Sequence, residues 1–336
     1  MTLYKEKSPP AEMRQLANGV YAFLQPADIF CSNSGLIVCD EYAIVIDSQT
    51  NRYMVENFIR KIREVTDKPV RFLFNTHWHT DHIYTNYYFT GANVITSSTN
   101  RKMTLRLDPI ELEFFSKVRP EPWWFDGAKV VPQNIVFDGT LTIYSGEREI
   151  RFIDLGPAHS ESDCIVYLPK EKIIFTGDLV VWNFPKTKPG VTALTHGSYR
   201  MIEVLSALAN MDAEFYVPGH GNTVLTREQV VQYASEVIEF LLVMREEARR
   251  CFNKGLTYKQ AVEEIDYNKL KKWGDKQSLY MVVFANCARA WSEFIGEPPG
   301  SLIDVEEIYA KMIPNLDGTY PERIDLGWTK PSGKKW

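Results

Sequence analysis

One stretch decides the fold of this chain: Asn75-Thr76-His77-Trp78-His79-Thr80-Asp81-His82. It directly follows an apolar run at residues 68–76 (KPVRFLFNT), which predicts a buried strand that ends at the first histidines. His77 and His79 are two residues apart, so an extended turn places both imidazoles on one side, within reach of one metal ion at ~2.0–2.1 Å. Asp81 and His82 lie just beyond them, where they could serve a second ion.

Three more residues of metal-ligand type each follow a strand-like run. His159 comes after EIRFIDL, Asp178 after KIIF and His220 after EFYV. Glycines stand close to all three and let the backbone turn tightly. A lone histidine, or even an HxH pair, is more often a loop or core residue than a ligand. Seven ligand-type side chains in this order indicate a metal site, and an inactive relative that keeps its ligands is the main alternative.

The complete pattern is HxHxDH, then a His, then an Asp after a TGD turn, then a His in PGHG. It resembles the metallo-β-lactamase superfamily over roughly residues 15–225. The resemblance implies an α/β fold, a four-layer αβ/βα sandwich with the site at the edge between two sheets. It also implies two Zn²⁺ ions, although Fe or Mn would fit such ligands too. By resemblance, one ion is held by His77, His79 and His159, the other by Asp81, His82 and His220, and Asp178 bridges the two.

The 336 residues suggest about two domains. Before residue 225, two runs of strands alternate with helices, which predicts helices on the outer faces of packed sheets. A hairpin is expected across Asp40-Glu41, and a helix from Tyr53 to Val65. From residue 226 apolar residues follow the helical period. We therefore predict a catalytic domain at residues 15–225 and a helical extension with a Pro/Gly-rich tail at residues 226–336.

The amino-acid composition limits the classes of binding partner that are expected. With 38 Lys+Arg against 43 Asp+Glu, the net charge of −5 gives no footprint for nucleic acid and no polybasic membrane patch. No apolar run approaches the ~20 residues of a membrane helix, and the N-terminus has no apolar signal region. Five scattered cysteines without a CxxC pair favour the cytoplasm. The expected partner is a small-molecule substrate, and the helical extension either covers the site or forms a homodimer interface.

The expected activity is dinuclear zinc-dependent hydrolysis, because two ions that share an oxygen lower the pKa of bound water toward neutrality. A metal-bridging hydroxide, oriented by Asp81, would attack a small carboxyl derivative: a lactone, ester, thioester or cyclic amide, including a β-lactam. Asp178 makes the chain resemble the glyoxalase II and lactonase branches, and VVFANCARAWSEF resembles a group that includes quinoprotein-relay proteins. Alternatives are phosphoester or sulfate-ester hydrolysis, iron-dependent persulfide oxidation, and a non-catalytic metal-binding interaction module.

Five further residues are candidates for the active site, and the sequence leaves two interpretations open for each. His196, the only histidine outside the pattern, is either a substrate contact and proton donor or a surface loop residue. Phe30 either contacts substrate from a flap or packs in the core. Trp123 and Trp124 either form a hydrophobic wall of the site or cover an outer helix. Asp163 either accepts a proton from a ligand imidazole or caps a turn.

Overall fold

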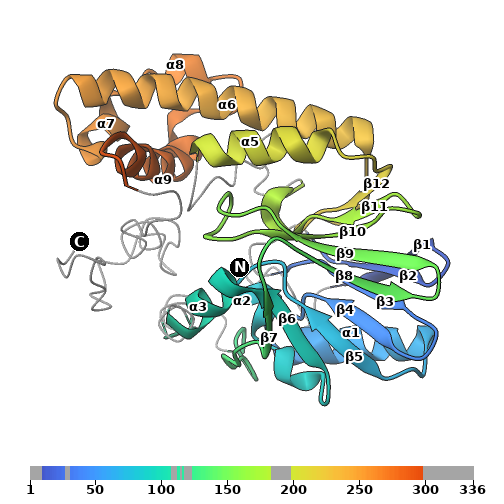
Figure 1. Ribbon diagram of the computed structural model, residues 1–336. Coiled ribbons are helices and arrows are strands. Elements are labelled where there is room, and N and C mark those ends of the chain that lie inside the picture. Colours follow the sequence, from blue (N-terminus) through green and yellow to red (C-terminus); the bar gives the residue numbers. More distant parts are fainter. Residues whose placement is uncertain are drawn as a thin grey trace.

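Two β-sheets lie face to face in the computed structural model, which describes residues 10–26, 31–106, 112–113, 116, 123–182 and 198–297 (Figure 1). The first sheet has seven strands in chain order, antiparallel from the first to the fourth and parallel from the fourth to the seventh. They are β1 Glu12–Ala17, β2 Val20–Leu24, β3 Ser34–Val38, β4 Ala43–Ile46, β5 Val70–Phe74, β6 Asn93–Ser97 and β7 Ile135–Phe137. The predicted hairpin is confirmed as β3 and β4.

The second sheet has six strands in the order β13-β12-β11-β10-β9-β8. They are β8 Thr140–Ser145, β9 Arg148–Asp154, β10 Cys164–Leu168, β11 Ile173–Phe175, β12 Phe215–Val217 and β13 Leu225–Thr226. All neighbours run antiparallel except β11 and β12, which are parallel. The carboxyl ends of β11 and β12 therefore meet at one edge.

In the central strands, alternating side chains are buried on both faces of the sheet. In β10, Cys164 and Val166 pack into the core between the sheets, whereas Ile165 and Tyr167 pack toward the helices. Between the sheets, the rings of Phe74 in β5 and Phe152 in β9 lie 4.4 Å apart, centroid to centroid. Strands buried on both faces read as nearly continuous apolar runs, which is why their positions could be predicted from the sequence.

Helices cover the two outer faces. Helix α1 (Arg52–Val65) buries Val55, Phe58 and Ile62 in one cluster with residues of the first sheet, and Asn51 caps its first turn. Helices α5 (Ser198–Ala209) and α6 (Arg227–Asn253) lie over the second sheet (Figure 1). The short helix α3 (Ser98–Arg106) follows β6. The predicted four-layer α/β sandwich is thus confirmed.

The helical extension begins where the second sheet ends. Thr226 caps α6 in a capping box with Gln229. Its remaining helices are α7 Tyr258–Glu264, α8 Tyr267–Leu270 and α9 Lys276–Phe294. These helices share one hydrophobic cluster with the second sheet. The division of the chain into two domains stays a prediction, and so does the homodimer.

Two features of the described residues bear on the cellular setting. None of the helices there is both long and apolar enough for a membrane crossing. The five cysteines are buried and form no disulfide. The cytoplasmic location stays a prediction.

Candidate metal centre

Five loops that follow strands place the site at one edge of the sandwich. Parallel β4 and β5 end there, and the loop after β5 carries the HxHxDH motif, whose last residues form the short helix α2 (Thr80–Ile83). The second sheet contributes His159 after β9, Asp178 after β11 and His220 after β12. Because carboxyl ends of parallel strands meet at one sheet edge, residues that are far apart in sequence converge here.

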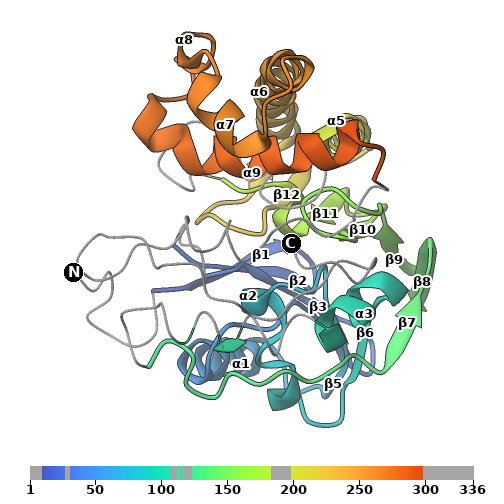
Figure 2. The same ribbon diagram turned by 90° about the vertical axis from the view of Figure 1, so that its left-hand side faces the viewer.

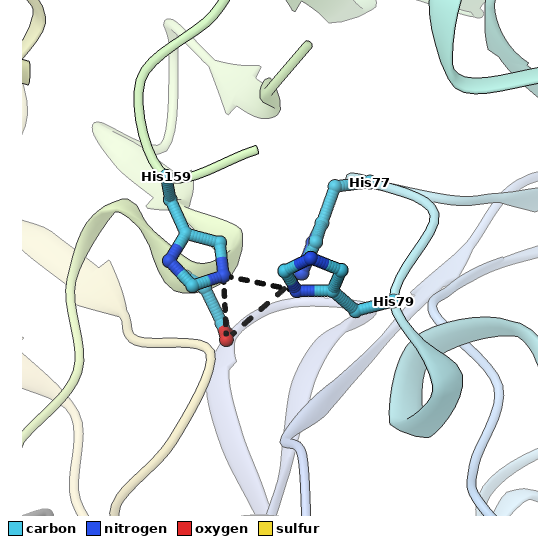
Figure 3. A group of neighbouring side chains, drawn as sticks. His77, His79 and His159 are labelled. Carbon is cyan, nitrogen blue, oxygen red and sulfur yellow. Dashed lines mark hydrogen bonds and ion pairs between the residues drawn. The ribbon is translucent and has the colours of Figure 1, made fainter. Parts of the chain in front are cut away.

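Four of the predicted ligands form one group. The potential ligand atoms of His77, His79, His159 and Asp178 all lie within 4.8 Å of one another. Figure 3 shows the three imidazoles pointing toward a common centre, His77 and His79 from one loop and His159 from another. Nε2 of His159 lies 3.1 Å from Nδ1 of His79 and 3.5 Å from Oδ2 of Asp178.

The other three predicted ligands form a second group directly beside the first. Ligand atoms of Asp81, His82 and His220 lie within 4.8 Å of one another. Asp178 stands between the groups, with Oδ1 3.3 Å from Nε2 of His82 and Oδ2 3.2 Å from Nε2 of His220. The structure therefore brings together all seven residues that the sequence predicted as ligands.

The buried lone pairs of these residues fit divalent cations. Nε2 of His77, Nε2 of His82, Oδ2 of Asp81 and Oδ1 of Asp178 are buried and make no hydrogen bond with the residues described. Buried polar atoms without a hydrogen bond are rare in folded proteins, and several that converge on one point fit a divalent cation. Imidazole and carboxylate donors suit Zn, Fe and Mn. With this fold, the donor set implies a divalent metal.

In the absence of bound ions, the neighbouring carboxylates and imidazoles shift the pKa values of three of the histidines. Burial alone would lower the pKa of His220, but the carboxylates of Asp178 and Asp81 outweigh burial and raise this pKa to about 10. In the same way, the pKa of His82 is raised well above its usual value by nearby carboxylates, despite burial. Burial and the neighbouring imidazoles lower the pKa of His77 well below its usual value. Without ions, His220 is therefore an imidazolium at neutral pH and lies against the carboxylates of Asp178 and Asp81.

Metal binding to the metal-free protein at pH 8 is expected to release at least one proton per protein, from His220. With its pKa raised to about 10, the imidazole of His220 is protonated at pH 8 and must be neutral to bind a metal. Calorimetry in buffers of different ionisation enthalpy measures the released protons. The affinity should weaken as the pH falls, because protons compete with the metal. Binding without proton release would contradict this electrostatic description.

Sequence reasoning missed Asp47, which directly follows β4 at the same edge. Its carboxylate accepts hydrogen bonds from the backbone N–H of Thr76 (2.8 Å) and from Oγ1 of Thr76 (2.7 Å), and lies 2.8 Å from Nδ1 of His82. Asp47 thereby orients one candidate ligand and holds the start of the HxHxDH loop. The signal was present, because YAIVIDS ends an apolar run with an Asp, as KIIFTGD does.

Replacing Asp47 by Ala is expected to lower metal affinity by roughly 10–100-fold, the usual effect of losing a carboxylate partner of a ligand imidazole. The ring of His82 would lose its orienting partner. Chelator competition with the metal-free protein measures the affinity. Asp40→Ala is the matched control, since Asp40 is exposed in the β3–β4 turn, away from the ligand loops. Equal affinities for the two variants would remove this role from Asp47.

The loop that carries His159 is fixed from inside by Asp163. Oδ2 of Asp163 accepts from the backbone N–H groups of Ala158 (3.2 Å) and Ser160 (2.8 Å), and Oδ1 accepts from the hydroxyl of Ser160 (2.9 Å). Burial raises the pKa of Asp163 to about 6, although His159 and these hydrogen bonds act against the shift. Of the two predicted roles, these hydrogen bonds of Asp163 fit the turn-capping one.

Of the four predicted substrate contacts, the structure describes Trp123 and Trp124. Phe30 and His196 lie outside the described residues. Trp124 is fully buried in the same cluster as Trp78, and Trp123 packs partly exposed against the ring of Tyr53. Contact of any of these residues with substrate stays a prediction.

Comparison with known proteins agrees with this geometry. Residues 29–220 match the family model described as the metallo-β-lactamase superfamily. The chain is 22% identical over 264 residues to the linear primary-alkylsulfatase of Pseudomonas sp. (strain ATCC 19151), which covers 68% of this chain and 49% of that protein. It is 23% identical over 228 residues to metallo-β-lactamase type 2 of Bacteroides fragilis, covering 64% and 81% respectively. The chain thus spans about half the length of the alkylsulfatase it matches.

Two solved structures share the fold. The metallo-β-lactamase from Pontibacter korlensis superposes with a TM-score of 0.54 at 18% identity, covering 68% of this chain and 99% of that chain. The metallo-β-lactamase FIM-1 from Pseudomonas aeruginosa, in its mono-zinc form, gives a TM-score of 0.54 at 16% identity, covering 70% and 98%.

Proposed function

The chain belongs to the metallo-β-lactamase superfamily, and from this premise we propose that it is a metal-dependent hydrolase with a dinuclear zinc centre. The observation that carries the proposal is the place of Asp178, whose two carboxylate oxygens face ligand atoms of both groups. A single carboxylate between two sets of imidazoles is suited to bridge two cations and to balance part of their charge. One ion would take His77, His79 and His159, the other Asp81, His82 and His220.

Divalent ions in such a centre supply Lewis acidity toward the scissile bond and lower the pKa of bound solvent toward neutrality. The chain's own residues supply the rest. Asp178 sets the spacing of the two ligand groups, and Asp47 holds the ring of His82. Among the seven ligand residues, His79 is partly exposed and the other six are buried.

The proposed substrate is a small carboxyl derivative, such as a lactone, ester, thioester or cyclic amide. A sulfate ester is the second candidate, because one of the relatives is a linear primary-alkylsulfatase that matches 68% of this chain. Both substrate classes place a developing negative charge on an oxygen, which a cationic centre stabilises. The site geometry is compatible with either, so a substrate panel separates them.

Elemental analysis of the purified protein, followed by a panel of lactone, ester, thioester, β-lactam, sulfate-ester and phosphodiester substrates, tests the proposal. We expect about two zinc ions per chain and turnover of a carboxyl derivative, lost on chelation and restored by added zinc. Turnover of alkyl sulfate alone would favour the second candidate. A protein that binds metal but turns over no member of the panel would count against both substrate classes.

A further inference from the structure

Asn33 joins the first sheet to the loop that carries His220. It directly precedes β3 and is 4% exposed. Its side-chain amide donates to the carbonyls of Pro218 (2.9 Å) and Gly221 (2.7 Å), on either side of His220. Its backbone N–H donates to the carbonyl of Gly219 (2.7 Å). In both views β3 lies below β12, so these three hydrogen bonds cross from one sheet to the other (Figures 1 and 2).

The amide group of Asn33 matches the atoms that surround it. Its NH₂ group has two hydrogens for the two carbonyls of the loop, and its Oδ1 accepts from the backbone N–H of Gln25 (2.8 Å). An amide offers two donors and an acceptor, whereas a hydroxyl offers one donor and a carboxylate none. Because these groups are buried, removing the donors would leave carbonyls of the His220 loop without partners, which is costly. The position of this loop therefore depends on Asn33.

Ser32, the preceding residue, holds the other loop of the second ligand group. It is fully buried, and its hydroxyl donates to the backbone carbonyl of Asp81 (2.5 Å). Its own carbonyl accepts from the side-chain amide of Gln25 (2.7 Å), directly after β2. Oδ2 of Asp81 and Nε2 of His220 lie 3.1 Å apart in this ligand group. One dipeptide of the first sheet thus bonds to both loops that must meet to form the group.

We propose that Ser32 and Asn33 are positioning residues of the metal centre, which hold Asp81 and His220 at the distance that binds the second ion. The proposal rests on the proposed function, since it presumes that these two side chains bind a metal. Within the described part of the chain, neither Ser32 nor Asn33 hydrogen-bonds to the loop that carries His159. Disturbing the dipeptide should therefore weaken the second ion and spare the first, which three imidazoles hold.

Stepwise zinc binding to the metal-free protein, measured by chelator competition, tests this role together with the free energy of unfolding in denaturant. His220→Ala and His159→Ala identify which binding step belongs to which ligand group. Asn33→Asp keeps the size of the side chain but turns a carboxylate oxygen, instead of two N–H donors, toward the loop carbonyls. It should weaken the step lost in His220→Ala by roughly 10–100-fold, the range for partners that act on ligands indirectly. The step lost in His159→Ala should keep its affinity.

Ser32→Ala removes only a hydroxyl and should weaken the same binding step, which keeps the test decisive if the first variant does not fold. Glu247→Gln is the matched control, because it also exchanges a carboxylate and an amide at a buried residue, 1% exposed. Glu247 binds Arg250 and Lys269 in the helical extension, each at 2.7 Å. The control should lose stability and keep both zinc affinities.

The outcomes separate this proposal from the one on which it rests. If the wild-type protein binds two zinc ions and the Asn33 and Ser32 variants bind both equally well, the positioning role is overturned. It is also overturned if these variants weaken both steps alike, or if Glu247→Gln weakens the second step as much, because the effect is then one of general stability. If the wild-type protein does not bind two ions of zinc, iron or manganese, the dinuclear centre itself fails, and this inference fails with it.

Discussion

Asp178→Asn is expected to abolish the dinuclear centre while leaving the chain folded. The amide keeps the size of the carboxylate but loses its charge, and its NH₂ group presents hydrogens to the imidazole nitrogens that Asp178 now faces at 3.2 and 3.3 Å. Loss of a metal removes several kcal/mol of transition-state stabilisation, which corresponds to a rate loss of roughly 10³-fold or more. Elemental analysis should find at most one ion per chain, and activity on the best substrate of the panel should fall accordingly.

Asp212→Asn is the matched control for this substitution. Asp212 has a side chain that is 75% exposed and lies 3.5 Å from Nζ of Lys172, so the same chemical change occurs at the surface. Metal content and activity should stay at the wild-type level. If Asp178→Asn also retained two ions and full turnover, Asp178 would not be a bridging ligand, and the dinuclear proposal would be wrong.

Gly219→Ala is expected to have the second largest effect, although Gly219 bears no ligand atom. A methyl group at this position would overlap Oδ1 of Asp178 and lie only 2.7 Å from the backbone carbon of Gly177. The backbone has little room to yield, because the N–H of Gly219 donates to the carbonyls of Gly177 (2.9 Å) and Val180 (3.0 Å). The carboxylate of Asp178 must then move, and a misplacement of about 1 Å can cost roughly 10²-fold in rate.

A fall of this size in activity, with a parallel fall in metal content, is the expected result for Gly219→Ala. Gly274→Ala serves as its control, since a methyl group there would meet side-chain atoms rather than backbone: Oγ of Ser278 at 2.6 Å and two carbons of Leu279 at 3.1 and 3.3 Å. Should both alanine variants keep their metal, the close approach of Gly219 to Asp178 would have no functional weight.

The sequence predicted the ligands well because each one ends an apolar run. His159, Asp178 and His220 come shortly after the ends of β9, β11 and β12, and the apolar runs of these strands leave a strong signal. Strand β1 (Glu12–Ala17) was missed, and the first sheet begins three residues before the predicted start of the domain at residue 15. This edge strand pairs only with β2 and is nowhere fully buried, so its residues carry no continuous apolar run.

Contacts between distant segments could not be predicted in the same way. The hydrogen bond from Nε1 of Trp78 to Oε2 of Glu161 joins the loop after β5 to the loop after β9, and no local pattern marks either residue as a partner of the other. Asp47 was within reach of sequence reasoning, but its contact with His82 depends on the parallel pairing of β4 with β5. Local periodicity predicts where helices and strands lie along the chain. Which of them lie side by side is decided by tertiary packing.

The ligand residues are divided between the halves of the sandwich. His77, His79, Asp81 and His82 follow a strand of the first sheet, and His159, Asp178 and His220 follow strands of the second. A growing polypeptide therefore completes the first ligand group only after residue 178 has been synthesised and the second only after residue 220, and each group also needs the second half to dock onto the first. This arrangement disfavours metal binding by an incomplete chain. An ion that binds after folding contacts both halves, so it would stabilise the folded protein against their separation.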